Sequence, residues 1–245
     1  MQVLPIHTRP LLAPKDSLLD ALVEARLTLR DGDIVAISSK VVAIHEGATV
    51  PLDAAEKEEL IKAQATWYQK GTRASRWRTW FTIAGGAFVG SAGVDESNGN
   101  GHYILYPKDP FKSAKMLRAW LMKTYGVQEI GVIITDSMST PLRRGAIGFA
   151  LAWDGIDPLR DYRGTQDIFG RTIKIELANL IDALAASAVL VMGEGAECTP
   201  VALIRDAKNI TLKNRSKKLD QLIVEPENDI FAPLFWNKRW KRGGR

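Results

Sequence analysis

The feature that most constrains the fold is an alternation of helical and apolar extended segments along the chain. Residues 114–125, AKMLRAWLMKTY, have the apolar spacing of a helix that Gly126 can end, and 131–136, GVIITD, follow as a buried strand. Residues 173–193 predict a second such unit, a long helix that leads into an apolar strand ending at Gly193. This alternation predicts an α+β or mixed α/β fold, with mixed sheets and flanking helices, rather than an all-β fold.

The N-terminal half continues this pattern. Residues 1–9, MQVLPIHTR, predict a first strand, and Asp16 or Ser17 can cap a helix that begins near Leu18. DGDIVAISSKVVAIHEG, residues 31–47, predicts a turn, a strand, a polar interruption and a continuation of the strand over 41–44. A charged amphipathic helix is expected within 53–71, and a glycine-rich strand within 81–93.

Charge and cysteine content narrow the functional classes. The 245 residues are 46% hydrophobic and 25% charged, and the formal net charge of +5 suits an anionic ligand, either a nucleotide or a nucleic acid. The single cysteine, Cys198, excludes an intramolecular disulfide and a cysteine-rich zinc site. The N-terminus has no secretory pattern, and no apolar run approaches the ~20 residues of a membrane span. We therefore expect a cytoplasmic protein with no membrane partner.

The short motifs that usually mark phosphate sites and serine hydrolases are missing. Neither G-x-x-x-x-G-K-[ST] nor G-x-S-x-G occurs, and GEGAEC at 193–198 has a cysteine where a dinucleotide fingerprint has its third glycine. The three histidines lie far apart, without the spacing of a zinc motif. Any catalytic site must therefore be assembled from residues that are distant in sequence.

Acidic residues follow three of the apolar segments. Asp95 comes after one segment, Asp136 with Ser137 ends another, and Glu194 follows a third. Magnesium prefers oxygen ligands, and strand ends can bring such ligands together. An acid after a strand is also a favoured turn former, so each of these acids could simply stabilise a turn.

Basic residues could supply the other half of an anion site. Lys40 interrupts the expected strand pair, and Arg143 and Arg144 follow Asp136 closely. Alternatively, Lys40 protects a sheet edge, and the two arginines form surface ion pairs with one of the acids Asp154, Asp157 and Asp161. From the residues alone, the site is a metal-assisted site for an anionic ligand.

Two further segments are rich in tryptophan and basic residues. RASRWRTW at 73–80 could stack on bases or on an aromatic ring system, or it could cover a groove or a dimer contact. The basic tail at 236–245 adds positive charge. Together they motivate an alternative in which the chain binds nucleotides or nucleic acid without catalysis, although three acids at one site make nucleic acid a poor partner. A metal-dependent phosphohydrolase is a third option.

Several motifs occur in an order that resembles the γ-glutamyl ligases of coenzyme F-420. They are DGDIVAISSKVVAIHEG, AGVDESNGNG, VIITDSMSTPLRRGAIGFALAWDGIDPLRDYRGTQDIFGR and LIDALAASAVLVMGEGAECTPVALIR. The segment GVDESNGNGHYILYPKDP is most similar to a bacterial branch described as folate γ-glutamate ligases. The resemblance implies one γ-glutamyl ligase-like domain over 1–245, with two intertwined lobes as an alternative arrangement.

The resemblance also implies a reaction. Enzymes of this kind use GTP to convert a substrate carboxylate into an acyl phosphate, which the amine of L-glutamate then attacks. Magnesium or manganese organises the phosphates. The implied acceptor is a folate or coenzyme F-420-0, and the implied assembly is a homodimer with its active site close to the subunit contact.

Site residues are carried over by position. The resemblance implies that Asp95 and Asp136 are catalytic and bind one metal ion, and that Ser137 and Glu194 bind the second. The implied nucleotide-binding residues are Pro10, Leu11, Leu12, Ser39, Lys40, Asn98, Met192, Gly193, Gly195, Ala196, Glu197, Cys198 and Thr199. No role is carried over to Arg143 or Arg144.

The chain departs from the family pattern at two places. Arg9 stands where many members have leucine, and residues 50–80 do not resemble the F-420 enzymes. Within that region Trp67, Trp77 and Trp80 could pack on a pterin or deazaflavin ring, or they could pack in the core or an interface. Both departures leave the acceptor open.

Overall fold

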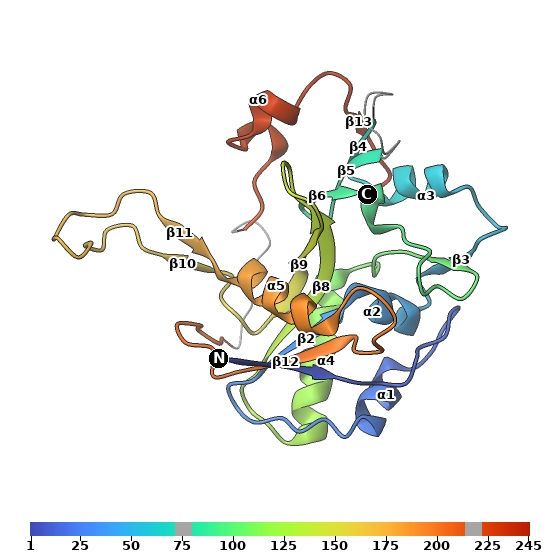
Figure 1. The fold of residues 1–245 in the computed structure, drawn as a ribbon, viewed down its shortest axis with the longest axis horizontal. Helices are drawn as coiled ribbons and strands as arrows, with labels where there is room; N and C mark the ends of the chain where they lie inside the picture. Colours follow the sequence, from blue (N-terminus) through green and yellow to red (C-terminus); the bar gives the residue numbers. More distant parts are fainter. Residues whose placement is uncertain (72–79, 214–221) are drawn as a thin grey trace.

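A computed structural model describes residues 1–71, 80–213 and 222–245 (Figure 1). Its main sheet has five strands in the order β1 (Gln2–Ile6), β12 (Val201–Arg205), β2 (Ile34–Ser38), β8 (Gly131–Ser139) and β9 (Ala146–Asp154). Strands β2 and β8 run parallel, whereas every other neighbouring pair is antiparallel. The sheet is therefore mixed, and the predicted α+β class is confirmed.

Helices cover both faces of this sheet because its central strands are apolar on both faces. Along β8, Ile133 packs with the buried side chains of α5 (Leu180–Met192), whereas Val132 and Ile134 point to the opposite core. That second core also includes side chains of α1 (Leu18–Glu24), α2 (Ser39–Glu46) and α4 (Pro110–Tyr125). Buried on both sides, β8 is a rigid support for the residues at its end.

A second sheet lies beside the first. Its order is β13 (Lys241–Arg242), β4 (Trp67–Lys70), β5 (Trp80–Ala84) and β6 (Ala87–Gly90), with α3 (Lys57–Gln64) next to it in Figure 1. The smaller pairs are β3 (Thr49–Pro51) with β7 (His102–Ile104), and β10 (Leu159–Asp161) with β11 (Leu177–Asn179). The β10–β11 pair begins an arm that extends away from the rest of the molecule (Figure 1). Within the described residues the remaining helices are short: η1 (Ser91–Gly93), η3 (Pro226–Asn228) and α6 (Ala232–Phe235).

Several local predictions are confirmed. The first strand is β1, and the Ser17 side chain caps α1 by accepting a hydrogen bond from the Asp20 N–H at 3.1 Å. Helix α4 ends at Gly126, whose φ of 71° is the left-handed conformation that glycine tolerates best. Within the described part of the chain, no helix is long and apolar enough to span a membrane.

Three element predictions are wrong. Residues 41–44 belong to helix α2, so Lys40 lies in the first turn of a helix and is not an edge-strand lysine. The apolar residues before Gly193 complete helix α5, and no strand precedes that glycine. The stretch 81–93 forms β5, β6 and η1, because the positive-φ pair Gly85–Gly86 turns the chain back on itself. In the two helical cases a run of β-branched or apolar residues predicts a strand; α5 buries residues at helical spacing, whereas residues 41–44 of α2 are all buried and show no periodicity that would reveal the helix.

The tryptophans in the second sheet pack against protein. Trp67 contacts Trp236 edge-on, with ring centroids 5.1 Å apart, and Trp80 is buried against Tyr68. Trp77 lies outside the described residues. The basic segment 236–245 also packs on this sheet, since β13 pairs with β4 and the Gly243 N–H donates to the Thr66 carbonyl.

Truncation of a side chain beneath the end of β8 tests its role as a support. We expect Ile134→Ala to lower the free energy of unfolding by about 2–5 kcal/mol, because the isoleucine is fully buried between β2 and β9. Ile147→Ala is the matched control; that side chain is 47% exposed and should change stability by about 0.5 kcal/mol or less. Urea unfolding measures both, and equal losses would contradict this description of the core.

Candidate functional site

Two adjoining cavities open where β2 and β8 end. Their volumes are about 420 Å³ and about 250 Å³. In the parallel pair Ser38 lies opposite Thr135, so α2 begins beside the point where β8 continues to Asp136 past the end of β2. The residues that line both cavities are Lys40, Ser97, Ile104, Asp136, Ser137 and Glu194.

Asp136 lies in the continuation of β8 and is held by hydrogen bonds. The Tyr106 hydroxyl donates to its Oδ2 at 2.6 Å, and the Ser137 backbone N–H also donates to the carboxylate. Burial raises the pKa of Asp136 to about 6, although Tyr106, Ser137 and the charge of Lys40 each lower it. Near neutral pH Asp136 is therefore charged, and burial of its charged form costs free energy. The buried Tyr106 in turn has a pKa well above its usual value, owing first to burial and then to the charge of Asp136.

Asp95 is organised by a lysine and a serine. The Lys40 Nζ lies 2.5 Å from its Oδ2, and the Ser97 hydroxyl lies 2.9 Å from both carboxylate oxygens. Burial raises the pKa of Asp95, but the hydrogen bonds from Lys40 and Ser97 outweigh it and leave the pKa below its usual value. Asp95 also exchanges backbone hydrogen bonds with Ile104 at 3.1 and 2.7 Å, which fixes its loop beside β7.

Glu194 reaches the same place from the end of α5. Its Oε2 accepts a hydrogen bond from the Ser137 hydroxyl at 3.3 Å. The loop after α5 is tied to the Asp95 loop, because the Asn98 side-chain amide donates to the Gly195 carbonyl at 3.1 Å. Strand β8, the loop after α5 and the loop after the β5–β6 hairpin therefore converge on one site.

The predicted site residues all line the two cavities. Among the residues carried over as nucleotide-binding, Ser39 lines the smaller cavity and the others line the larger one. Of the predicted metal ligands, Asp95 lines the smaller cavity, and Asp136, Ser137 and Glu194 line both. Among the described residues, no three His, Cys, Asp or Glu side chains lie close enough to form a metal-binding group. The predicted residues therefore share one location, and their roles stay predictions.

Arg143 and Arg144 lie apart from this group. They are exposed at the turn between β8 and β9 and line neither cavity. Their predicted ion-pair partners bind other residues: Asp154 pairs with Arg118, Asp157 with Lys213 and Asp161 with Arg163. The ion-pair alternative for the two arginines is therefore wrong.

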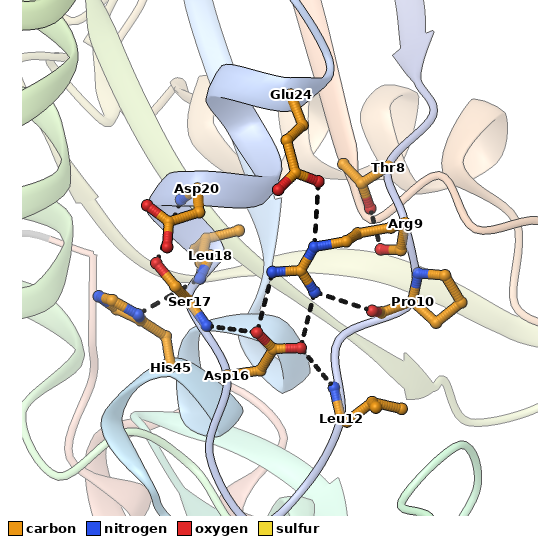
Figure 2. Close-up of polar contacts among 10 residues, drawn as sticks. All are labelled: Thr8, Arg9, Pro10, Leu12, Asp16, Ser17, Leu18, Asp20, Glu24 and His45. Atoms are coloured by element: carbon orange, nitrogen blue, oxygen red, sulfur yellow. Dashed lines mark hydrogen bonds and ion pairs between the residues drawn. The ribbon is translucent and has the colours of Figure 1, made fainter.

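Sequence reasoning missed Tyr106 and the role of Arg9. The Arg9 guanidinium donates to both oxygens of Asp16, at 2.7 and 2.9 Å, and to Glu24 at 3.1 Å (Figure 2). Asp16 also accepts the Leu12 N–H at 3.0 Å, and the hydrogen bond from Arg9 is the main cause of its strongly lowered pKa. Arg9 thus shapes the 10–12 loop that lines the larger cavity. The sequence signal that could have indicated this ion pair is Asp16, an acidic residue seven positions after Arg9.

The raised pKa of Asp136 predicts that this acid destabilises the fold. Its native pKa of about 6 lies above its usual value of 3.8, so native stability should fall as the pH rises from about 4 to 6. Asp136→Asn should therefore be more stable than the parent at pH 8 in EDTA, by on the order of 2 kcal/mol, with the difference shrinking toward pH 4. Urea unfolding at several pH values measures this, and a less stable variant at pH 8 would contradict the assignment.

Loss of the Arg9 guanidinium should loosen the cavity loop more than it destabilises the protein. We expect Arg9→Met to speed amide hydrogen exchange at Leu12, while the free energy of unfolding changes by about 1 kcal/mol or less because the ion pair is partly exposed. Arg163→Met removes a similarly fork-shaped pair with Asp161, far from the loop, and is the control. Unchanged exchange at residues 8–18 would show that Arg9 does not order the loop.

Comparison with known proteins identifies the family of this chain. The family described as F420-0:Gamma-glutamyl ligase matches residues 8–206. The coenzyme F420:L-glutamate ligase of Methanopyrus kandleri is 35% identical over 94% of this chain and 97% of its own length. The enzyme of that name from Methanocaldococcus jannaschii is 33% identical over 84% of this chain and 87% of its own length. The chain therefore belongs to the F420-0:gamma-glutamyl ligase family and is an enzyme of the ligase class.

Proposed function

We propose that this chain is a GTP-dependent γ-glutamyl ligase that joins the amine of L-glutamate to a carboxylate of coenzyme F-420-0 or a folate. The observation that carries the proposal is the junction of the two cavities, where Lys40, Asp136 and Glu194 meet. Membership of the family, with relatives named coenzyme F420:L-glutamate ligase, supports the reaction type and the F-420 acceptor.

The nucleotide is assigned to the larger cavity. Its volume of about 420 Å³ lies within the range of small-molecule sites, and the loops 8–12 and 192–199 form two of its walls. Lys40 stands at the junction with the smaller cavity, where its ammonium can neutralise phosphate oxygens as a point charge. The phosphate chain would then point toward the two aspartates.

The donor atoms of the smaller cavity are of the type that divalent ions prefer. Asp95, Asp136, Ser137 and Glu194 are all oxygen donors, as magnesium and manganese require, although among the described residues no three acidic side chains lie close enough together to form a complete metal-binding group. Asp95 and Asp136 would hold one ion, and Ser137 and Glu194 would hold a second; the ions would supply charge neutralisation for the transferred phosphoryl group. The raised pKa of Asp136 is consistent with cation binding, because a nearby cation would stabilise the charged form of this carboxylate.

The proposed reaction then proceeds in two steps, and one bond forms and one breaks in each. A carboxylate oxygen of the acceptor bonds to the γ-phosphorus of GTP while the bond to GDP breaks, which leaves an acyl phosphate. The glutamate amine bonds to the acyl carbon, the carbon–oxygen bond to phosphate breaks, and the ammonium proton leaves to solvent. The protein contributes mainly position and charge, with Lys40 and the loop ends aligned around the reacting groups.

Removal of the Lys40 charge should slow the reaction without unfolding the protein. We expect Lys40→Met to lower kcat/KM for glutamate addition by about 10²–10³, because its ammonium is placed where phosphate charge develops. The control is Lys57→Met, which removes a nearby lysine that pairs with Glu96 and lines neither cavity. Equal activity in the two variants would remove Lys40 from the site.

A direct assay tests the function and its alternative together. The protein is incubated with L-glutamate, Mg²⁺, and GTP or ATP, with coenzyme F-420-0 or a reduced folate as acceptor, and mass spectrometry detects addition of glutamate. We expect addition with GTP and at least one acceptor, accompanied by phosphate release. Phosphate release at full rate without glutamate or acceptor would instead identify a phosphohydrolase. Absence of both products would refute the proposal.

A further inference from the structure

We infer that Tyr106 is a positioning residue of the active site: its hydroxyl fixes the Asp136 carboxylate in the orientation that the divalent ion needs. The inference rests on the proposed function, since it assigns Asp136 to that ion. The family resemblance implies no role for Tyr106, and Tyr106 does not belong to the loops that are proposed to bind the nucleotide.

The contact between the two residues is close and shielded. Tyr106 is 2% exposed, and its hydroxyl donates to the Asp136 Oδ2 at 2.6 Å. A carboxylate held by such a close, shielded donor has a preferred orientation, whereas a carboxylate without one can rotate.

The position of the Tyr106 ring is fixed by close packing against its neighbours. A Cβ added to Gly93, whose φ is 72°, would lie 2.1 Å from the Tyr106 Cζ and 2.2 Å from its Cε1. The glycine backbone therefore lies directly against the ring, and any side chain at position 93 would displace it. The neighbouring Leu105 N–H donates to the Ala48 carbonyl, which anchors the backbone as well.

The same short segment also holds the other aspartate. Ile104 exchanges two backbone hydrogen bonds with Asp95, and Tyr106, two residues later, holds the side chain of Asp136. Residues 104–106 thus set the relative placement of the two acids, which come from different parts of the chain. Partners that orient metal ligands commonly change metal affinity or activity by about 10–100-fold when they are removed.

The test measures Mn²⁺ binding without turnover. Free Mn²⁺ is followed by electron paramagnetic resonance during titration of the parent protein, Tyr106→Phe, Asp136→Asn and the control Tyr125→Phe. Tyr125 also donates a hydroxyl hydrogen bond, to the Leu22 carbonyl at 3.2 Å, and lines neither cavity. We expect Tyr106→Phe to raise the Kd for Mn²⁺ by roughly 10–100-fold, and Tyr125→Phe to leave it unchanged.

The possible outcomes separate the inference from the proposed function. Weaker binding in Tyr106→Phe and Asp136→Asn, with a normal control, supports both. If only Asp136→Asn binds more weakly, the positioning role is wrong and the metal site stands. If the parent does not bind Mn²⁺, or Asp136→Asn binds like the parent, the proposed metal site is wrong, and the positioning role of Tyr106 is then wrong as well.

A second measurement covers the case in which Tyr106→Phe does not fold. Site-specific 3-fluorotyrosine at position 106 keeps both the ring and the hydroxyl. Mn²⁺ should broaden its fluorine resonance, with the same Kd that the titration gives for the parent. A resonance that stays sharp when the Mn²⁺ site is saturated would overturn the inference.

Discussion

The parallel pairing of β2 with β8 is the contact on which the site depends. With Ser38 opposite Thr135, α2 begins where β8 continues past the end of β2, so Lys40 and Asp136 become neighbours although almost a hundred residues separate them. A shift of one residue in this register would turn the side chains of β8 to the opposite faces. The dense apolar packing of Ile133 and Ile134 on opposite faces opposes such a shift, and the core therefore fixes the geometry of a polar site.

At this edge of the sheet, burial disfavours the charged forms of Asp136 and Asp95, and the positive charge of Lys40 favours them. Asp136 is held charged near neutral pH despite burial, while Asp95 is stabilised by Lys40 and Ser97. A protein selected only for stability would gain by replacing such an acid with a neutral residue. Retention of an unfavourably placed carboxylate beside a lysine is typical of a site that receives a cation or an anionic substrate. The proposed reaction needs both.

Local signals in the sequence predict the supports of the site better than the site itself. The strand over 131–136 and the glycine that ends α4 follow from apolar periodicity and backbone preference, and both are present. Residues 41–44 look like a strand because they are mostly β-branched, yet tertiary packing places them in α2. The convergence of Asp95 with Asp136 depends on strand pairing between distant segments, which no local pattern encodes. Tyr106 lies within the segment GVDESNGNGHYILYPKDP, but nothing in that segment indicates a role for it, and its importance follows only from its hydrogen bond to Asp136. The homodimer and the cytoplasmic location stay predictions.

In the proposed reaction the acceptor carboxylate becomes an acyl phosphate at the junction of the two cavities, and the function depends on this step. Oxygen-18 in that carboxylate tests the step most directly, with the released inorganic phosphate analysed by mass spectrometry. One labelled oxygen should pass from the acceptor to phosphate for each glutamate added. Glutamate addition that releases only unlabelled phosphate would contradict it.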